Sequence, residues 1–253
     1  MIRVEHIPAE SGEGTIARVV IDRREKKNAL TPDMLENIRA AADKVHEERG
    51  GVRAFVLAGE GDVFCAGFDL SLCKDDPLAM GDLLTRLSHA VRAIRRLPMP
   101  VIAAAHGAAI AGGCALLCAA DFVITNREAR LGYPVVRLGV SPAVNAPILA
   151  VAIGHGRARE RLLDPSVFSG EEALRIGFAH TCADTVDQVN GEAMRLAHRL
   201  AAKPHHSLYM TKHWLNELDA SDDPDLLEGA LKASLAITNT EEERSLLSAV
   251  WKR

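Results

Sequence analysis

The stretch PVIAAAHGAAIAGGCALLCAADFVI, residues 100–124, decides the local structure around which the rest of the chain is organised. The run from Val101 to Ala105 is short and apolar, as in buried strands, and His106-Gly107 interrupts it. Gly112-Gly113 then opens a second apolar segment that is long enough for two helical turns. We therefore predict a strand, a glycine-containing turn and a helix, in this order.

A helix that begins at Gly112 or Gly113 has an end that attracts an oxyanion. Its first N–H groups have no intrahelical partners, and the aligned peptide dipoles place roughly half a positive charge there. Because glycine lacks a Cβ atom, a carbonyl oxygen of a ligand can come within hydrogen-bonding distance of the main chain. One such N–H group supplies half of an oxyanion-binding site.

A second main-chain donor is predicted upstream, where residues 63–70 read VFCAGFDL after a Gly-Glu-Gly turn. Gly67 gives the same steric freedom, so we expect the N–H of Phe68 to face the N–H of Gly112 across a pocket. Two main-chain donors that converge on one oxygen form an oxyanion hole, and loss of one donor typically raises the barrier by about 2.7–4 kcal/mol. Either glycine alone is more simply a turn or packing residue, whereas the pair favours the site.

At these residues the chain resembles the enoyl-CoA hydratase/isomerase superfamily, also called the crotonase superfamily. The resemblance implies an α/β fold, with a crotonase-like spiral of ββα repeats and the acyl-CoA site in residues 1–195. It also implies a helical C-terminal region in residues 196–253 for trimerisation, and assembly as a homotrimer or hexamer. The matching motifs follow the family's order: RREKKNAL (23–30), FCAGFDL (64–70), HGAAIAGGCALLCAADFVI (106–124), LGYP (131–134), LGVSP (138–142) and SGEEALRIGFAH (169–180).

The resemblance also implies a ligand. The family binds acyl-CoA thioesters and holds the enolate oxygen with two main-chain N–H groups, which fall here on Phe68 and Gly112. Coenzyme A then enters as part of the substrate, and no permanently bound cofactor is expected. Lys26 and Lys27 become neighbours of the CoA phosphates, although a run of charges is more commonly a solvated turn. Residues 63–70 carry Phe68 and precede Gly112 in the chain, and we call them the first donor loop. The remaining contacts with substrate are expected from this loop, at Cys65, Ala66, Asp69 and Leu70.

Three positions depart from the hydratase pattern. In resembling hydratases one catalytic glutamate lies three positions past the donor glycine, where this chain has Ala115, and another follows the proline of the next motif, where it has Val135. Some relatives place an acid where Ala143 stands. Hydration of a conjugated double bond requires a group that takes a proton from water and one that delivers a proton to the α-carbon. Alanine and valine do neither.

Polar residues near these positions are candidate replacements. Tyr133, Arg137, Ser141 and Asn145 lie in the segment that normally delivers the acids, and each carries a hydrogen-bonding group. Of these, Tyr133, Ser141 and Asn145 are taken as candidate pocket residues. Each one taken singly is more simply structural. Asp69 follows the first donor directly, and the corresponding acid in similar proteins tends to support the loop.

The sequence argues against two other enzyme classes, the dinucleotide-binding enzymes and the α/β-hydrolases. The GEG turn at residues 59–61 lacks the third glycine of a dinucleotide fingerprint, because Phe64 stands there and another turn follows. Residues 139–141 superficially resemble a nucleophile elbow. The residue after Ser141, however, is Pro142, which has no N–H for an oxyanion hole.

The composition fits an ordinary globular protein, folded as one large domain or as a core with a helical appendage. Of the 253 residues, 48% are hydrophobic and 25% charged, and the net charge of −4 gives no electrostatic reason to bind nucleic acid or an anionic membrane. No run approaches the roughly 18 apolar residues of a membrane span. The odd number of cysteines, five, indicates reduced thiols in a cytoplasmic protein. Cys114 and Cys118 are one helical turn apart and are expected to pack in the core, and no metal site is predicted.

Local signals predict further elements. Thr31-Pro32 is a helix start, and Ser169 with Glu172 forms a capping box for a helix that ends at Gly177. From Val186 the chain is largely helical in pattern. The predicted elements are a first strand 16–21, a helix from 31 to 50, a strand 52–57, a helix through 83–94, and later helices divided at 203–204 and 222–224, the last covering 241–253.

Two functions follow. The first is an enoyl-CoA hydratase/isomerase family enzyme that acts on an acyl-CoA thioester through an oxyanion-hole-stabilised enolate, by hydration, isomerisation or decarboxylation. The second is an acyl-CoA-binding protein of the same fold without hydratase activity.

Overall fold

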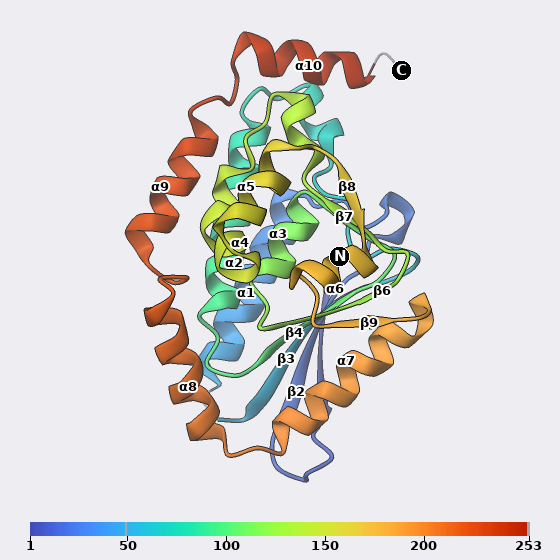
Figure 1. The fold of residues 1–253 in the computed structure, drawn as a ribbon, viewed down its shortest axis with the longest axis vertical. Coiled ribbons are helices and arrows are strands. Elements are labelled where there is room, and N and C mark those ends of the chain that lie inside the picture. Colours follow the sequence, from blue (N-terminus) through green and yellow to red (C-terminus); the bar gives the residue numbers. More distant parts are fainter. Residues whose placement is uncertain (49, 252–253) are drawn as a thin grey trace.

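The computed structural model describes residues 1–48 and 50–251 and has an α/β fold built on two sheets (Figure 1). The larger sheet has the order β1-β2-β3-β4-β6-β9, in which β1 and β2 are antiparallel and the other neighbours parallel. The smaller sheet has the order β5-β7-β8. The strands are β1 (Ile2–Pro8), β2 (Thr15–Ile21), β3 (Val52–Gly59), β4 (Val101–Ala105), β5 (Ala108–Ile110), β6 (Phe122–Asn126), β7 (Arg130–Gly132), β8 (Val167–Ser169) and β9 (Thr181–Ala183).

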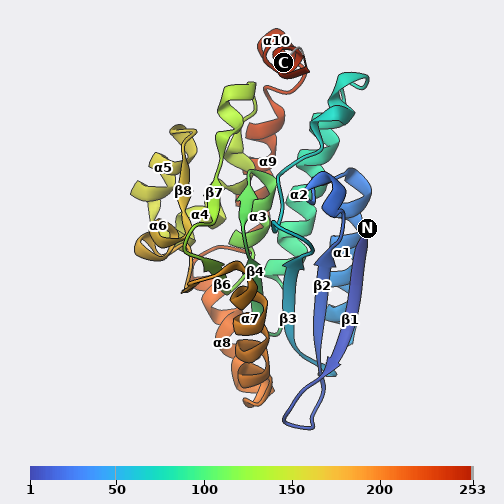
Figure 2. The ribbon, with the colours of Figure 1, turned by 90° about the vertical axis from the view of Figure 1, so that its right-hand side faces the viewer.

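Helices cover both faces of the larger sheet (Figures 1 and 2). The predicted α/β class and helical C-terminal region are confirmed. The α-helices are α1 (Pro32–Glu47), α2 (Ala79–Arg95), α3 (Gly112–Cys118), α4 (Ala146–Ile153), α5 (His155–Leu163), α6 (Gly170–Ile176), α7 (Val186–Ala201), α8 (His205–Leu218), α9 (Pro224–Leu235) and α10 (Glu241–Trp251). Short 3-10 helices are η1 (Arg24–Lys26), η2 (Leu70–Lys74), η3 (Pro134–Leu138) and η4 (Pro142–Asn145). In the helical C-terminal region, α9 packs against α2 and η4, and α10 packs against η2 and η3.

The larger sheet has a hydrophobic core on each face. Along β3, Phe55 and Leu57 point into the core formed with α1, α2 and α3, whereas Val56 and Ala58 point into the core formed with α7. Successive strand residues face opposite sides, so both sets are buried. Every residue of β4 is buried. This double burial explains why the β4 sequence is an uninterrupted apolar run.

Several predicted boundaries are confirmed. The hydroxyl of Thr31 accepts a hydrogen bond from the Met34 N–H at the start of α1, and α3 begins at Gly112. The helix breaks at 203–204 and 222–224 also lie between α7, α8 and α9. The division of the chain at residue 195 stays a prediction, and that position lies inside α7.

The predicted strand 16–21 is confirmed as β2, but the sequence pattern does not reveal β1 before it, because β1 is an edge strand whose polar residues hide its alternation. One local interpretation needs correction. The capping box at Ser169 is half formed: the Ser169 hydroxyl accepts from the Glu172 N–H at 3.1 Å, but the Glu172 carboxylate binds Arg161 and Arg175 instead. Charge-assisted bonds to guanidinium groups are stronger than a bond to a neutral N–H.

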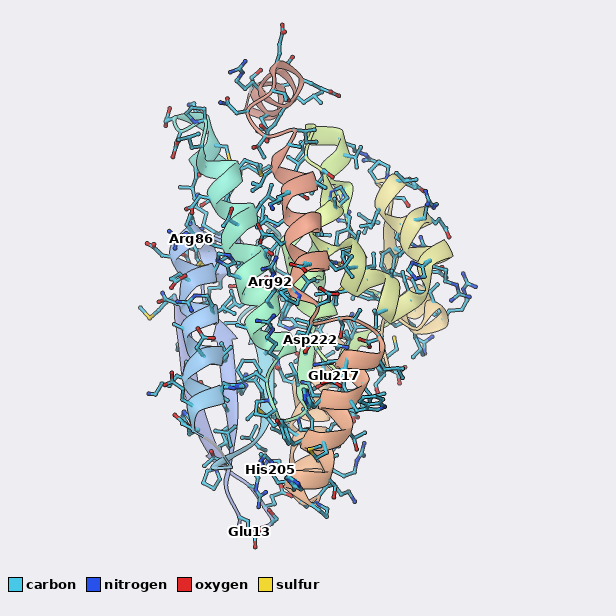
Figure 3. All side chains as sticks on the ribbon, turned by 90° about the vertical axis from the view of Figure 1, so that its left-hand side faces the viewer. Glu13, Arg86, Arg92, His205, Glu217 and Asp222 are labelled. Atoms are coloured by element: carbon cyan, nitrogen blue, oxygen red, sulfur yellow. The ribbon has the colours of Figure 1, made fainter. Side chains whose placement is uncertain are left out.

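Ion pairs attach the C-terminal helices to the core. On α8, Lys212 Nζ donates to Asp121 Oδ2 at 2.7 Å and to the Met99 carbonyl at 3.0 Å. On α2, Arg92 faces α9 and its Nη2 lies 3.3 Å from Glu228 Oε2 (Figure 3). Among the described residues, no helix is both long and apolar enough to cross a bilayer.

A buried asparagine joins the two segments that lead to the predicted site. Asn28 is fully buried and has a positive φ of 57°, a conformation that asparagine tolerates better than most residues. Its Oδ1 accepts from the Arg23 N–H at 2.8 Å. Its Nδ2 donates to three carbonyl oxygens, those of Glu60 (2.8 Å), Val63 (2.9 Å) and Phe64 (3.2 Å).

We expect Asn28→Gly to lower the free energy of unfolding by about 2–4 kcal/mol, because buried carbonyls lose their donor while the positive φ is kept. Urea denaturation measures this change. Asn239→Gly is the matched control, since Asn239 has a φ of 58° but is exposed, and its effect should stay within about 0.5 kcal/mol. Equal effects of the two substitutions would contradict the role given to the Asn28 side chain.

Candidate active site

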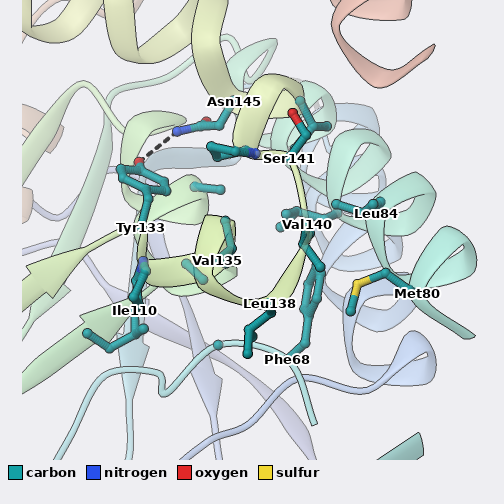
Figure 4. Close-up of a pocket in the computed structure, with 18 of the residues that line it drawn as sticks. Phe68, Met80, Leu84, Ile110, Tyr133, Val135, Leu138, Val140, Ser141 and Asn145 are labelled. Carbon is teal, nitrogen blue, oxygen red and sulfur yellow. Dashed lines mark hydrogen bonds between the residues drawn. The ribbon is translucent and has the colours of Figure 1, made fainter. Parts of the chain in front are cut away.

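A cavity of about 140 Å³ lies where the first donor loop, α2, the start of α3 and residues 133–145 meet (Figure 4). Its wall is almost entirely apolar. The lining residues are Ala66, Gly67, Phe68, Leu70, Met80, Leu84, Leu87, Ile110, Ala111, Gly112, Ala115, Tyr133, Pro134, Val135, Leu138, Val140, Ser141, Pro142, Val144 and Asn145.

The backbone around Phe68 is paired with Leu30 on one side, and its other side faces away from this partner. Leu30 N donates to the Gly67 carbonyl at 2.7 Å, and Asp69 N donates to the Leu30 carbonyl at 2.9 Å, which forms a single parallel bridge between Leu30 and Phe68. In such a bridge the central residue's own N–H points away from the partner strand. Within the described residues, the Phe68 N–H donates to no protein acceptor.

Gly112 and Gly113 bring α3 against the first donor loop. A Cβ atom on Gly112 would lie 2.9 Å from Cε1 of Phe68, and one on Gly113 would lie 2.8 Å from the Cys65 carbonyl oxygen. Both positions therefore require glycine for this close approach. In the described part of the chain, the N–H of Gly112, the first of the helix, also has no protein acceptor.

The residue before α3 has a strained backbone. Ala111 has φ 51° and ψ −108°, a region in which non-glycine residues cost of order 1–3 kcal/mol. Its N–H donates to the Gly132 carbonyl at 2.8 Å, which fixes the turn against β7. The turn thus holds the start of α3 at the cavity.

Asp69 lies beside the cavity and supports the loop. Its carboxylate binds the Arg23 guanidinium at 2.8 Å and the Ser71 hydroxyl at 2.5 Å. Burial alone would raise the pKa of Asp69, but the hydrogen bonds from Ser71 and Arg23 outweigh it and lower the pKa. The carboxylate is therefore ionised and occupied at neutral pH.

The other residues predicted around the loop lie in different environments. Ala66 and Leu70 line the cavity, whereas Cys65 is fully buried behind the loop, where burial raises the pKa of its thiol to about 12. Lys26 and Lys27 are exposed and do not line the cavity. The carbonyl of Lys27 accepts from the Ala66 N–H at 3.0 Å, which joins that turn to the donor loop.

The three predicted polar residues all line the cavity. Ser141 caps η4, since its Oγ accepts from the Ala143 N–H at 3.2 Å. Asn145 Nδ2 donates to the Tyr133 hydroxyl at 2.7 Å (Figure 4) and to Cys118 Sγ at 3.2 Å. Tyr133 and Asn145 are each only 2% exposed.

Charged groups are missing from the described wall of the cavity, which contains no Asp, Glu, His, Lys or Arg. Ala115 and Val135 line it, whereas Ala143 lines a neighbouring cavity of about 730 Å³. Burial raises the pKa of Tyr133 well above its ordinary value, and that of Cys118 to about 11. Both groups are therefore protonated at neutral pH. Among the described residues, no cluster of three or more His, Cys, Asp or Glu side chains is arranged to hold a metal ion.

The sequence did not identify the apolar wall or Cys118 as parts of this site. Met80, Leu84 and Leu87 on α2 looked like ordinary core positions of an amphipathic helix. The periodic pattern identifies the buried face of such a helix, but it does not distinguish a filled core from a cavity wall.

Solved structures define the class of protein. The chain has the crotonase fold of Pseudomonas aeruginosa OdaA, with a TM-score of 0.84, 28% identity, and coverage of 100% of this chain and 99% of that one. An enoyl-CoA hydratase/isomerase from Xanthobacter autotrophicus Py2 is similarly close, with a TM-score of 0.85, 28% identity, and coverage of 98% and 93%.

Sequence comparison then gives the family. The enoyl-CoA hydratase/isomerase family model matches residues 11–249, and the chain belongs to this family. It is 29% identical to the short-chain-enoyl-CoA hydratase of Clostridium acetobutylicum, over 94% of this chain and 91% of that protein. It is 30% identical to the crotonyl-CoA hydratase of Syntrophomonas wolfei, over 81% of this chain and 79% of that protein.

Proposed function

We propose that the chain binds an acyl-CoA thioester with its carbonyl oxygen between the N–H groups of Phe68 and Gly112. The observation that carries this proposal is that, among the described residues, neither N–H group has a protein acceptor, and that Phe68 and Gly112 line the same cavity in close contact with each other. Abstraction of a proton from the α-carbon, or loss of an α-substituent, moves negative charge onto that oxygen. Two preorganised donors stabilise this charge more strongly in the enolate than in the neutral thioester.

The rest of the ligand has candidate contacts on the same side. Ala66 and Leu70 line the cavity beside the donor loop, and Lys26 and Lys27 lie in the exposed turn that is hydrogen-bonded to Ala66. Exposed ammonium groups are suitable partners for the CoA phosphates. The apolar wall formed by α2 and η3 suits an acyl chain.

Binding of butyryl-CoA tests the proposed donors. We expect Gly112→Ala to raise the Kd at least tenfold, because the added Cβ would lie 2.9 Å from the Phe68 ring and obstruct the approach to the main chain. Gly191→Ala on α7 is the matched control, since a Cβ there would meet only Arg195 Nη1 at 3.8 Å. Calorimetric titration measures both. An unchanged Kd for Gly112→Ala would remove the basis for the oxyanion site.

The second part of the proposal concerns the type of reaction at this site. Among the described residues, no Asp, Glu or His lines the cavity, and the lining residue Tyr133 is held protonated, as is Cys118, to which it is hydrogen-bonded. These side chains therefore supply no base at neutral pH. We infer an enzyme of the family whose chemistry requires little proton transfer by the protein. The second candidate, an acyl-CoA-binding protein without hydratase activity, is favoured by the same wall without carboxylates.

Hydration of crotonyl-CoA distinguishes these proposals from an ordinary hydratase. We expect the wild-type rate to be close to that of the uncatalysed reaction. The double variant Ala115→Glu, Val135→Glu should raise it by about 10²-fold or more, because it places acid–base groups in the cavity wall. Leu163→Glu, which adds the same charge at an exposed side chain beside the neighbouring cavity, is the control and should leave the rate unchanged. A robust wild-type rate would show that another group moves the proton.

We also propose that α8 carries a subunit interface of a homotrimer or hexamer. Met210, Trp214 and Leu218 repeat every four residues on one face of α8, and Trp214 and Leu218 are 63% and 70% exposed. Contiguous exposed apolar side chains of this size favour association with a partner surface.

Trp214→Glu should therefore lower the molar mass measured by light scattering after size exclusion, because it places a charge in the proposed interface. Leu78→Glu, at a side chain that is also 70% exposed but lies outside α8, should leave the mass unchanged. A monomeric wild-type protein would contradict the proposal.

A further inference from the structure

A pair of buried polar side chains stands at one point of the otherwise apolar cavity. Tyr133 and Asn145 come from the start of η3 and the end of η4, and Cys118 comes from the last turn of α3. The three are joined by hydrogen bonds, with Asn145 Nδ2 at 2.7 Å from the Tyr133 oxygen and 3.2 Å from Cys118 Sγ. The position of the Tyr133 hydroxyl is thereby fixed by two other elements (Figure 4).

Within this cluster, the hydrogen of the Tyr133 hydroxyl has at best a weak acceptor. Asn145 gives both of its amide hydrogens, one to Tyr133 and one to Cys118. The Tyr133 oxygen and Cys118 Sγ lie 3.3 Å apart, and either atom can be the donor. When the thiol donates, the tyrosine oxygen has two donors and its own hydrogen is free. When the tyrosine donates, its acceptor is sulfur, which is a weak one.

The amide of Asn145 has a second environment on its other side. A small void of about 10 Å³ there is lined by Ser88, Arg92 and Asn145. Arg92 Nε and Asn145 Oδ1 are both buried without a protein partner in the described structure. Asn145 is a positioning residue for Tyr133, because its own Nδ2 holds the tyrosine oxygen.

The electrostatics of the wall restrict what the hydroxyl can bind. Burial, together with the thiols of Cys118 and Cys114, raises the pKa of Tyr133, so the hydroxyl is a neutral donor throughout the physiological range. No cationic side chain is among the described lining residues. A carboxylate placed here would lose its hydration without gaining a counter-ion, which is costly. A neutral oxygen requires only one donor, which the Tyr133 hydroxyl can supply.

We propose that Tyr133 donates a hydrogen bond to a neutral oxygen on the acyl chain, a hydroxyl or a keto group. The cavity then prefers oxygen-bearing acyl-CoA thioesters over the plain acyl thioester and over acyl groups that end in a carboxylate. This inference rests on the proposed binding of the thioester at Phe68 and Gly112.

Calorimetric titration of the full chain with a matched ligand series tests this preference. The probes are butyryl-CoA, 3-hydroxybutyryl-CoA, 4-hydroxybutyryl-CoA, 3-oxobutyryl-CoA and malonyl-CoA. We expect at least one neutral oxygen-bearing thioester to bind about tenfold more tightly than butyryl-CoA. Malonyl-CoA should bind more weakly than butyryl-CoA.

Three variants assign the preference to the hydroxyl. Tyr133→Phe should abolish the preference and leave the Kd of butyryl-CoA within about twofold, because the ring and its packing remain. Asn145→Ala should reduce the ratio between the affinity for the preferred oxygen-bearing thioester and the affinity for butyryl-CoA. A purely structural role of Asn145 would not change this ratio. Ser141→Ala tests the other hydroxyl of the wall, whose Oγ accepts from the Ala143 N–H, and a preference that persists in this variant assigns the donor to Tyr133. Loss of the preference in Ser141→Ala with its retention in Tyr133→Phe would overturn the inference.

The outcomes separate the two proposals. If no acyl-CoA binds to the wild type, the proposed function fails. If butyryl-CoA binds and the oxygen-bearing thioesters bind no better, or if malonyl-CoA binds most tightly, the proposed function stands and this inference is overturned. A preference that survives in Tyr133→Phe also overturns it.

Discussion

Two backbone hydrogen bonds of Cys65 set the geometry on which the proposed site depends. The Cys65 N–H donates to the Ala108 carbonyl, and the Cys65 carbonyl accepts from the Ile110 N–H, both at 3.0 Å. This short bridge attaches the first donor loop to β5, which leads directly into α3. Gly113 allows the contact, because any side chain there would strike the Cys65 carbonyl. The relative positions of Phe68 and Gly112 therefore follow from main-chain pairing, and no charged side chain is needed to hold them.

Other interactions reinforce this pairing from outside the cavity. Asn28 holds the carbonyls that precede Cys65, and the ion pair between Arg23 and Asp69 fixes the loop after it. On the other side, Ala111 accepts an unfavourable backbone conformation and is held by β7. Strain and buried polar bonds thus gather around the two donor segments, as is common where a protein preorganises a site.

The cavity wall separates charge stabilisation from proton transfer. Main-chain N–H groups are independent of side-chain identity, so an oxyanion site persists when the surrounding side chains become apolar. Acid–base chemistry has no such independence, because it needs a side chain whose pKa lies near the working pH. In this chain Ala115 and Val135 line the wall, and the pKa values of Tyr133 and Cys118 are raised by burial. In the proposed function, the wall therefore orders a ligand and stabilises an oxyanion without moving a proton.

The sequence by itself determined the α/β class and the helix starts at Thr31 and Gly112, because capping residues, glycines and apolar periodicity act over a few residues. The resemblance to the family rested on whole motifs that follow the family's order, and from it came the prediction that Ala115, Val135 and Ala143 stand where relatives have acids. Only the tertiary structure decided that β1 forms the edge strand, that Glu172 pairs with arginines instead of completing its box, and that Cys118, Tyr133 and Asn145 share one hydrogen-bond cluster. It likewise placed α2 as a cavity wall. These features depend on which partners approach from distant parts of the chain, and local residue patterns carry no information about that approach.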